Sequence, residues 1–139
     1  YHVTRDPSKV VVAGSSFGGI ASVYAGLRHP ETFGAILCQS GSFWWADPKP
    51  APYAEPNFLA REFIRSPKLP LRFYLDAGAF EVDLSGQGNG ILLPSRHMRD
   101  VLLARGYSVR YQENIGGHDY LSWRGSFADG LIALMAPAE

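Results

Sequence analysis

Four short segments typical of β-strands alternate with segments of helical periodicity along this chain, and this alternation constrains the fold more than any other feature. The strand-like segments span residues 9–13, 33–38, 71–75 and 107–113. The helical segments span residues 17–27 and 58–64, a stretch from Leu92 to Gly106, and residues 123–135. Strands that alternate with helices form mostly parallel sheets covered by helices on both faces. We therefore predict that residues 1–139 form one α/β domain.

The composition excludes several classes of partner. Thirteen basic and thirteen acidic residues give a formal net charge of zero, so nucleic acid and anionic membrane surfaces are not expected partners. No apolar run is long enough to cross a bilayer. The single cysteine, Cys38, lies in an apolar run and is predicted to be a buried strand thiol. No Cys/His cluster has metal-ligand spacing, so no metal site is predicted.

The segment Gly14-Ser15-Ser16-Phe17-Gly18 matches the G-x-S-x-G pattern of a nucleophile elbow. It follows a Val-rich strand and opens an amphipathic helix, which is the context that the elbow of α/β-hydrolases requires. The two glycines are expected to avoid collisions at the sharp turn. Ser16 is then the candidate nucleophile, and the backbone N–H of Phe17 is the candidate oxyanion donor. The alternative is a glycine-rich structural turn.

Several stretches together resemble the enterochelin (enterobactin) esterase family, in the esterase D-like branch of the α/β-hydrolases. They are residues 10–19, 24–27, 30–34, the run Gln39-Ser40-Gly41-Ser42-Phe43-Trp44-Trp45, and Gly116-Gly117-His118-Asp119 with Trp123-Arg124-Gly125 behind it. The resemblance covers most of the chain and is weakest between residues 46 and 69.

The resemblance implies a cytoplasmic serine esterase that hydrolyses ester bonds of a catecholate siderophore such as ferric enterobactin. No cofactor is expected, because any iron would arrive with the substrate. Family members also carry an N-terminal β-sandwich domain and the first half of the hydrolase sheet. Residues 1–139 are thus expected to form the C-terminal part of the catalytic domain, with the second oxyanion donor lying outside them. An unpaired edge strand would favour self-association, so a homodimer is a candidate state.

The resemblance maps the catalytic histidine to His118, which follows a predicted strand on a loop that can reach Ser16. The order along α/β-hydrolase chains is nucleophile, acid, histidine, so the acid should lie between the two. Asp76, Glu81 and Asp83 are the candidates. We favour Glu81, whose position resembles that of the acid after the third strand in related esterases. Its role would be to accept the ring N–H of the histidine.

Candidate substrate contacts lie on a loop and on the last helix. Phe43, Trp44 and Trp45 follow the second strand, and three adjacent aromatic residues cannot all face a core. They form either a binding surface for an aromatic acyl group such as a catecholate or a packing surface for the rest of the domain. Arg124 is either a partner for an anionic substrate or a solvated residue on a helix face.

Two classes of alternative function stay open. One is another acyl enzyme on the same fold, such as a feruloyl-type esterase, a formylglutathione-type thioesterase or a mycolyltransferase. The other is a catalytically inactive structural module.

Overall fold

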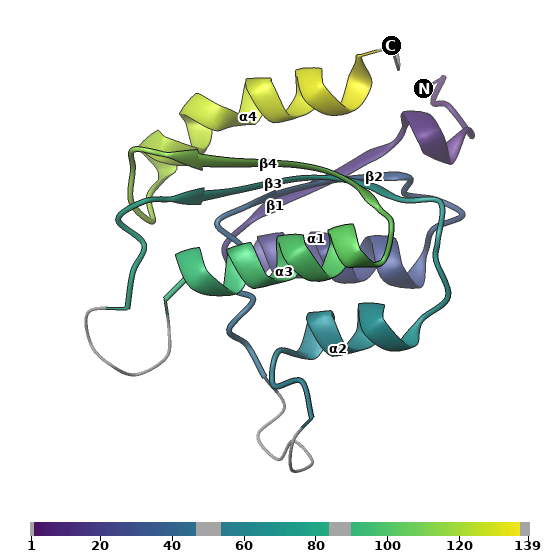
Figure 1. Ribbon diagram of the computed structural model, residues 1–139. Helices are drawn as coiled ribbons and strands as arrows, with labels where there is room; N and C mark the ends of the chain where they lie inside the picture. The colour runs from purple at the N-terminus through teal and green to yellow at the C-terminus, as the bar shows by residue number, and fades with distance from the viewer. Residues whose placement is uncertain (1, 47–53, 84–89, 137–139) are drawn as a thin grey trace.

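A computed structural model describes residues 2–46, 54–83 and 90–136. Its sheet contains four strands: β1 (Val11–Ser15), β2 (Ala35–Gln39), β3 (Arg72–Gly78) and β4 (Ser108–Asn114). They lie side by side in the order β1-β2-β3-β4, and each pairs with its neighbour in parallel (Figure 1). The predicted parallel sheet is therefore confirmed. The sequence also predicts long loops over residues 39–56 and 76–89, of which residues 47–53 and 84–89 lie outside the described residues.

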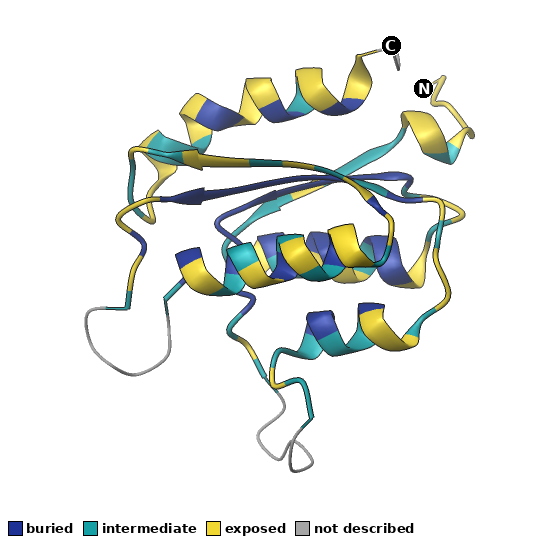
Figure 2. Ribbon diagram, in the orientation of Figure 1, coloured by how far each residue is buried: buried dark blue, intermediate teal, exposed yellow. Residues whose placement is uncertain are grey.

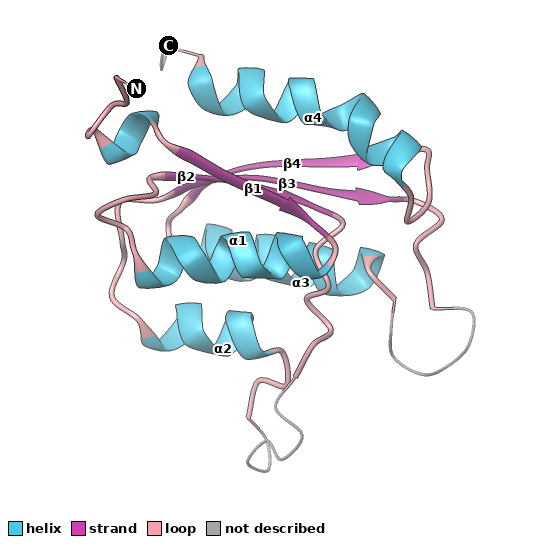
Figure 3. Ribbon diagram, turned by 180° about the vertical axis from the view of Figure 1, so that it is seen from behind, coloured by secondary structure: helices cyan, strands magenta, loops and turns pink. Residues whose placement is uncertain are grey.

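Helices cover both faces of the sheet, as predicted. α1 (Phe17–Arg28) and α3 (Leu92–Ala104) pack on one face, and α2 (Phe58–Arg65) packs on the outer side of those two helices (Figures 1 and 3). α4 (Tyr120–Met135) covers the other face. A short 3₁₀ helix, η1 (Pro7–Lys9), precedes β1. No helix in the described ranges has both the length and the apolar character needed to cross a bilayer.

The larger core lies between the sheet and the three helices α1, α2 and α3. Phe63, Phe73 and Tyr107 meet edge to face there, with ring centroids 5.4–5.7 Å apart. Figure 2 shows β2 and β3 as the most deeply buried strands, and all five residues of β2 are buried. Cys38 is fully buried in β2, as predicted, and burial raises the pKa of its thiol well above the usual value. Continuous burial is expected where a parallel strand is covered on both faces.

The apolar run that forms β1 is predicted to be covered on both faces, but the structure shows β1 only partly buried. None of its residues is fully buried, and Ala13 is exposed. The reason is that β1 lies at the edge of the described sheet and pairs only with β2. A homodimer built on this edge stays a prediction.

Two helices bury only some of the residues that the apolar pattern places on their inner faces. The pattern of α3 predicts an inner face of Leu92, Leu93, His97, Val101 and Leu102. Leu92 and Leu102 are buried, together with Ser95 and Met98, but Leu93 and His97 are exposed. The pattern of α4 places Phe127, Leu131, Leu134 and Met135 on one face. Leu134 is buried and Leu131 packs against the core, but Phe127 and Met135 are exposed, whereas Gly130 is buried. A Cβ at Gly130 would lie only 2.8 Å from the side chain of Leu37. α4 thus approaches the sheet through Ser126, Gly130 and Leu134, whereas Phe127 and Met135 face outward.

The parallel strands bring three loops to one edge of the sheet. β1 ends at Ser15, β3 at Gly78 and β4 at Asn114, and all three strands end at the same edge. Polar groups that follow the carboxyl ends of parallel strands gather in this way. Ser16, Glu81 and His118 lie on these three loops, so the fold brings them together although they are far apart in sequence.

Candidate active site

Ser16 occupies a sharp turn between β1 and α1. Its backbone has φ 58° and ψ −122°, a conformation that non-glycine residues rarely adopt. Its N–H donates to the Gln39 carbonyl at 2.9 Å, and its carbonyl accepts from the Gly19 N–H at 3.0 Å and the Ser42 N–H at 3.2 Å. These contacts fix the unfavourable backbone. The Ser16 side chain makes no capping bond to α1, so its hydroxyl is available to the loop from β4.

The two glycines of the elbow have different roles. A Cβ on Gly14 would lie 2.1 Å from the Gly18 carbonyl oxygen, a distance that real structures do not allow. A Cβ on Gly18 would meet no heavy atom within 4 Å among the described residues. The expectation that both glycines prevent collisions is therefore wrong for Gly18. Gly14 is needed because the absence of a side chain there leaves room for the backbone carbonyl of Gly18.

We expect Gly14→Ala to destabilise the fold by about 3 kcal/mol, because a backbone carbonyl cannot move aside as a side chain can. Gly18→Ala is the matched control and should change stability by less than about 1 kcal/mol, since alanine favours a helix. Urea unfolding of both variants measures the difference. Equal unfolding midpoints would show that β1 and α1 are not in close contact at this turn.

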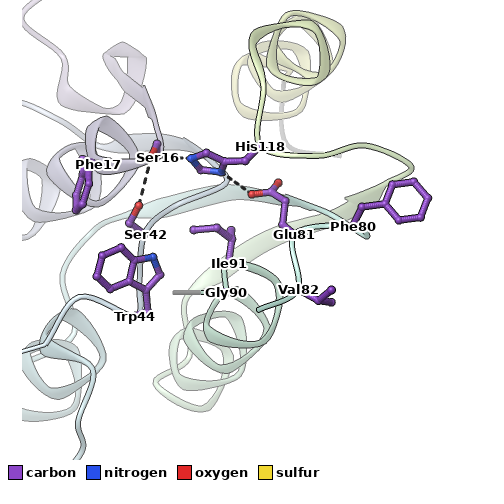
Figure 4. Close-up of a pocket in the computed structure, with 10 residues that line it drawn as sticks. All are labelled: Ser16, Phe17, Ser42, Trp44, Phe80, Glu81, Val82, Gly90, Ile91 and His118. Carbon is purple, nitrogen blue, oxygen red and sulfur yellow. Dashed lines mark hydrogen bonds and ion pairs between the residues drawn. The ribbon is translucent and has the colours of Figure 1, made fainter. Parts of the chain in front are cut away.

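Ser16, His118 and Glu81 form a continuous hydrogen-bonded chain (Figure 4). Nε2 of His118 lies 2.8 Å from the Ser16 hydroxyl oxygen, and Nδ1 lies 2.7 Å from Oε2 of Glu81. A carboxylate only accepts, so Nδ1 carries the ring proton and Nε2 is the acceptor for the serine hydroxyl. This is the arrangement in which a hydroxyl can pass its proton to an imidazole.

Glu81 is held by donors on both carboxylate oxygens. Its side chain is 1% exposed, whereas that of His118 is 40% exposed. Oε1 accepts from the Gly78 N–H at 2.7 Å and from the Ser40 hydroxyl at 2.6 Å, and Oε2 faces His118. Donors on both oxygens fix the orientation of the Glu81 carboxylate. Glu81 is thus able to orient the imidazole and to stabilise its protonated form.

The other two candidate acids lie elsewhere. Asp76 belongs to β3 rather than to the loop after it, and it is buried. Its carboxylate accepts from the Ser126 hydroxyl at 2.6 Å and from the Ser40 N–H at 3.2 Å. Burial raises the pKa of Asp76 above its usual value. Asp83 lines a separate hollow beside Leu93. Of the three acids, the structure places Glu81 against the histidine.

The raised pKa of Asp76 gives a pH-dependent prediction for Asp76→Asn. The folded protein holds the Asp76 proton to a higher pH than the unfolded chain, where the aspartate pKa is about 3.9. Wild-type stability relative to Asp76→Asn is therefore greatest below that value, and it falls as pH rises through the folded-state pKa. Urea unfolding of both proteins from about pH 3 to pH 7 measures the difference. A difference that grows in favour of the wild type with rising pH would contradict the prediction.

A hollow of about 380 Å³ opens beside the Ser16–His118–Glu81 chain. It is lined by Ser16, Phe17, Ser42, Trp44, Phe80, Glu81, Val82, Gly90, Ile91 and His118 (Figure 4). Trp44 meets Phe17 edge to face, with ring centroids 5.7 Å apart. The N–H of Phe17 is the first of α1 and has no acceptor in an earlier turn of that helix. The hollow therefore offers an aromatic wall and a backbone donor next to the serine hydroxyl.

The predicted substrate contacts are only partly brought to this hollow. Trp44 lines it, as predicted for a binding surface. Phe43 is buried in the core, and Trp45 packs edge-on against Phe58 at 5.4 Å, beside a second, apolar hollow. Arg124 is exposed on α4 and does not line the hollow with Ser16. The three adjacent aromatic residues thus face three different surroundings.

Three neighbours of the site were not predicted from the sequence. The Ser42 hydroxyl lies 3.4 Å from the Ser16 hydroxyl, and Ser40 and Trp123 lie behind Glu81 and His118. All three belong to the stretches that carry the family resemblance, but no spacing rule singles them out. No group of three or more His, Cys, Asp or Glu side chains in the described segments could hold a metal ion.

Comparisons with known proteins agree with this architecture. The family model described as "Putative esterase" matches residues 1–134. The iron(III) enterobactin esterase of Dickeya dadantii (strain 3937) is 38% identical over 138 residues, which cover 94% of this chain and 30% of that protein. The protein of the same name from Escherichia coli O6:H1 is 39% identical over 132 residues, with coverage of 93% and 30%.

Solved structures show the same similarity. The enterobactin esterase from Shigella flexneri, crystallised in the presence of enterobactin, matches with a TM-score of 0.77 at 35% identity, over 94% of this chain and 31% of that chain. A ferulic acid esterase matches with a TM-score of 0.76 at 18% identity, a likeness that shows the α/β-hydrolase fold alone. The chain spans about 30% of the length of the curated relatives it matches. The match over residues 1–134 shows that the chain belongs to the family described as "Putative esterase", and within it the chain is similar to the enterobactin esterases.

Proposed function

We propose that this chain supplies the nucleophile, base and acid of a serine esterase that hydrolyses ester bonds of a catecholate siderophore such as ferric enterobactin. The observation that carries the proposal is the hydrogen-bonded chain from Ser16 through His118 to Glu81 beside an aromatic-walled hollow. We place the reaction in the cytoplasm, where the ferric siderophore arrives after uptake. Iron enters as part of the substrate.

The proposed reaction begins with attack by Ser16 on the ester carbonyl. Nε2 of His118 removes the hydroxyl proton as the new C–O bond forms. The negative charge on the carbonyl oxygen is stabilised by the N–H of Phe17 and by a second donor that we expect outside this chain. His118 then gives its proton to the departing alcohol oxygen, and an acyl group remains on Ser16. Throughout, Glu81 holds the proton on Nδ1 and stabilises the imidazolium.

The second half of the reaction restores the enzyme. A water molecule gives a proton to Nε2 of His118 and attacks the acyl carbonyl. The tetrahedral intermediate collapses, the bond to Ser16 breaks, and the serine oxygen recovers the proton from the imidazole. The products are a carboxylic acid and free Ser16, so one water molecule is consumed in each cycle.

Two features support an aromatic acyl substrate. Trp44, Phe17 and Phe80 line the hollow together with the apolar side chains of Val82 and Ile91, and aromatic rings bind well against such edges. The related proteins from Dickeya dadantii and Escherichia coli are named iron(III) enterobactin esterases. The related Shigella flexneri enterobactin esterase was crystallised with 2,3-dihydroxy-N-benzoyl-serine.

A substrate panel tests the proposed class. A purified protein that contains this chain together with the expected second oxyanion donor is incubated with ferric enterobactin, a feruloyl ester and S-formylglutathione, and the products are separated by chromatography. We expect release of 2,3-dihydroxybenzoyl-serine with a kcat/KM at least tenfold above the other two substrates. Preference for the feruloyl ester or the thioester would move the protein to another acyl-enzyme class. Turnover of none of the three would favour an inactive module.

We expect Trp44→Ala to raise KM for the siderophore about tenfold with little change in kcat, because an aromatic contact of about 1.4 kcal/mol would be lost. Steady-state kinetics measure the change. Trp45→Ala is the matched control, since Trp45 is 43% exposed and does not line this hollow. A larger rise in KM for Trp45→Ala than for Trp44→Ala would contradict this prediction, because it would show that the aromatic group of the substrate binds near Trp45 and not in the hollow beside Ser16.

A further inference from the structure

The Ser40 hydroxyl lies directly behind the candidate acid. It is fully buried and donates to Oε1 of Glu81 at 2.6 Å. Ser40 follows β2 with φ 47°, in the left-handed region that favours glycine. Its N–H is held by Asp76, through the backbone carbonyl at 3.0 Å and the carboxylate at 3.2 Å. A side chain with a hydroxyl therefore occupies a backbone position where glycine would be more stable.

Trp123 of α4 contacts both His118, the candidate base, and Ser40, which donates to the candidate acid Glu81. Its indole Nε1 donates to the Ser40 hydroxyl oxygen at 2.9 Å. Its ring packs edge-on against the imidazole of His118, with centroids 5.0 Å apart and planes at 88°. The Trp123 carbonyl accepts from the Gln39 side chain at 2.7 Å, which fastens this turn of the helix to the end of β2.

The direction of this hydrogen-bonded chain is fixed by chemistry. An indole N–H can only donate, and a carboxylate can only accept. Ser40 must therefore accept from Trp123 and give its own proton to Glu81, which in turn accepts from Nδ1 of His118. Successive bonds that point the same way polarise and strengthen one another.

We propose that Ser40 and Trp123 are positioning residues that hold Glu81 in the orientation where Oε2 alone faces His118. This inference rests on the proposed function and deepens it. With Ser40 and the Gly78 N–H both on Oε1, the carboxylate cannot rotate. Without Ser40, only the Gly78 N–H of these two donors would remain on Oε1, and the Glu81 carboxylate could turn away from the imidazole. The ring of His118 would then lose the contact that selects its tautomer.

Two substitutions remove the donors with little other change. Ser40→Gly deletes the hydroxyl at a φ that glycine adopts freely, so no strain is added. Trp123→Phe keeps an aromatic ring against His118 but removes the N–H. Ser95→Ala is the control for loss of a buried hydroxyl, because Ser95 is fully buried on α3 and its hydroxyl has no partner in the described structure.

Each of the two variants is expected to lower kcat by about 10- to 100-fold with KM within about twofold of wild type. The double variant should lose little more than either single one, because both remove the same chain of contacts. Ser95→Ala should keep wild-type kcat. Nitrogen-15 NMR of His118 provides a readout that a merely structural role would not move: the Nδ1–H tautomer, dominant in wild type, should fall in both variants.

The rate at which a fluorophosphonate labels Ser16 separates this inference from the substrate proposal. That rate depends on His118 as base and not on any siderophore, so it should fall in Ser40→Gly and Trp123→Phe even if ferric enterobactin is not the substrate. Wild-type labelling rates together with an unchanged His118 tautomer would overturn the positioning role. So would losses of activity that simply follow the loss of folded protein.

Discussion

Replacing Ser16 with alanine is expected to lower kcat for ester hydrolysis by about a million-fold, because the atom that forms the acyl-enzyme is removed. The fold should persist, since the contacts that fix this turn are made by the backbone N–H and carbonyl of Ser16. Circular dichroism checks the fold, and single-turnover kinetics measure the residual rate. Removal of one member of such a triad commonly leaves a small rate above that in water, which comes from substrate binding and the oxyanion donors.

Ser15→Ala is the matched control for this substitution. Ser15 is the adjacent serine, and its hydroxyl contacts the Gln39 side chain at 3.3 Å rather than the histidine. We expect its kcat to stay within a few-fold of wild type. If Ser15→Ala removed activity and Ser16→Ala did not, the elbow would present a different hydroxyl from the one that the structure points at His118.

Glu81→Gln is expected to lower kcat by about ten thousand-fold. The amide of glutamine can donate to Nδ1 of His118, which would move the ring proton to Nε2. That nitrogen could then no longer accept the Ser16 proton, although the geometry would be almost unchanged. Steady-state kinetics at neutral pH measure the loss.

Asp83→Asn provides the comparison, because Asp83 lies two residues after Glu81 and was a candidate for the same role. Its kcat should stay within about tenfold of wild type, since Asp83 does not line the hollow that contains Ser16 and His118. A larger loss in Asp83→Asn than in Glu81→Gln would assign the acid to Asp83, and the observed contact between Glu81 and His118 would be secondary.

The elbow and the histidine could be predicted because their signals are local. Ser16 lies between a Val-rich strand and a helix in a five-residue motif that begins with Gly14, and His118 follows the last strand in the order that α/β-hydrolases require. The parallel sheet followed from the alternation of strands and helices. The elbow motif itself depends on residues close together in the chain, and parallel pairing then brings the loops to one edge.

The acid could not be selected on residues alone because the choice depends on where β3 ends. The predicted strand stopped at Leu75, whereas β3 continues to Gly78 and takes Asp76 into the buried sheet. Aspartate is uncommon in strands, so the sequence pattern favoured a loop there. Only the register against β4, which pairs Gly78 with Asn114, shows that Glu81 comes within reach of His118.

The directions of the side chains on the loops and on α4 could not be predicted from the sequence either. Adjacent aromatic residues at 43–45 separate into the core, the hollow and the surface because the loop turns between them. On α4, Gly130 sets which face meets the sheet, so Leu134 is buried as the apolar pattern predicts, whereas Phe127 is exposed. The support from Ser40 and Trp123 joins residues 83 positions apart, and no local pattern predicts such a contact.

The covalent state of Ser16 during turnover can be measured by mass spectrometry of rapidly quenched reactions. If Ser16 attacks the ester with His118 as base, the peptide that contains Ser16 will carry the mass of the acyl group, and the adduct will be lost in Ser16→Ala and in His118→Ala. An acyl group found instead on Ser15 or Ser42, or steady turnover with Ser16 never modified, would contradict the proposed mechanism.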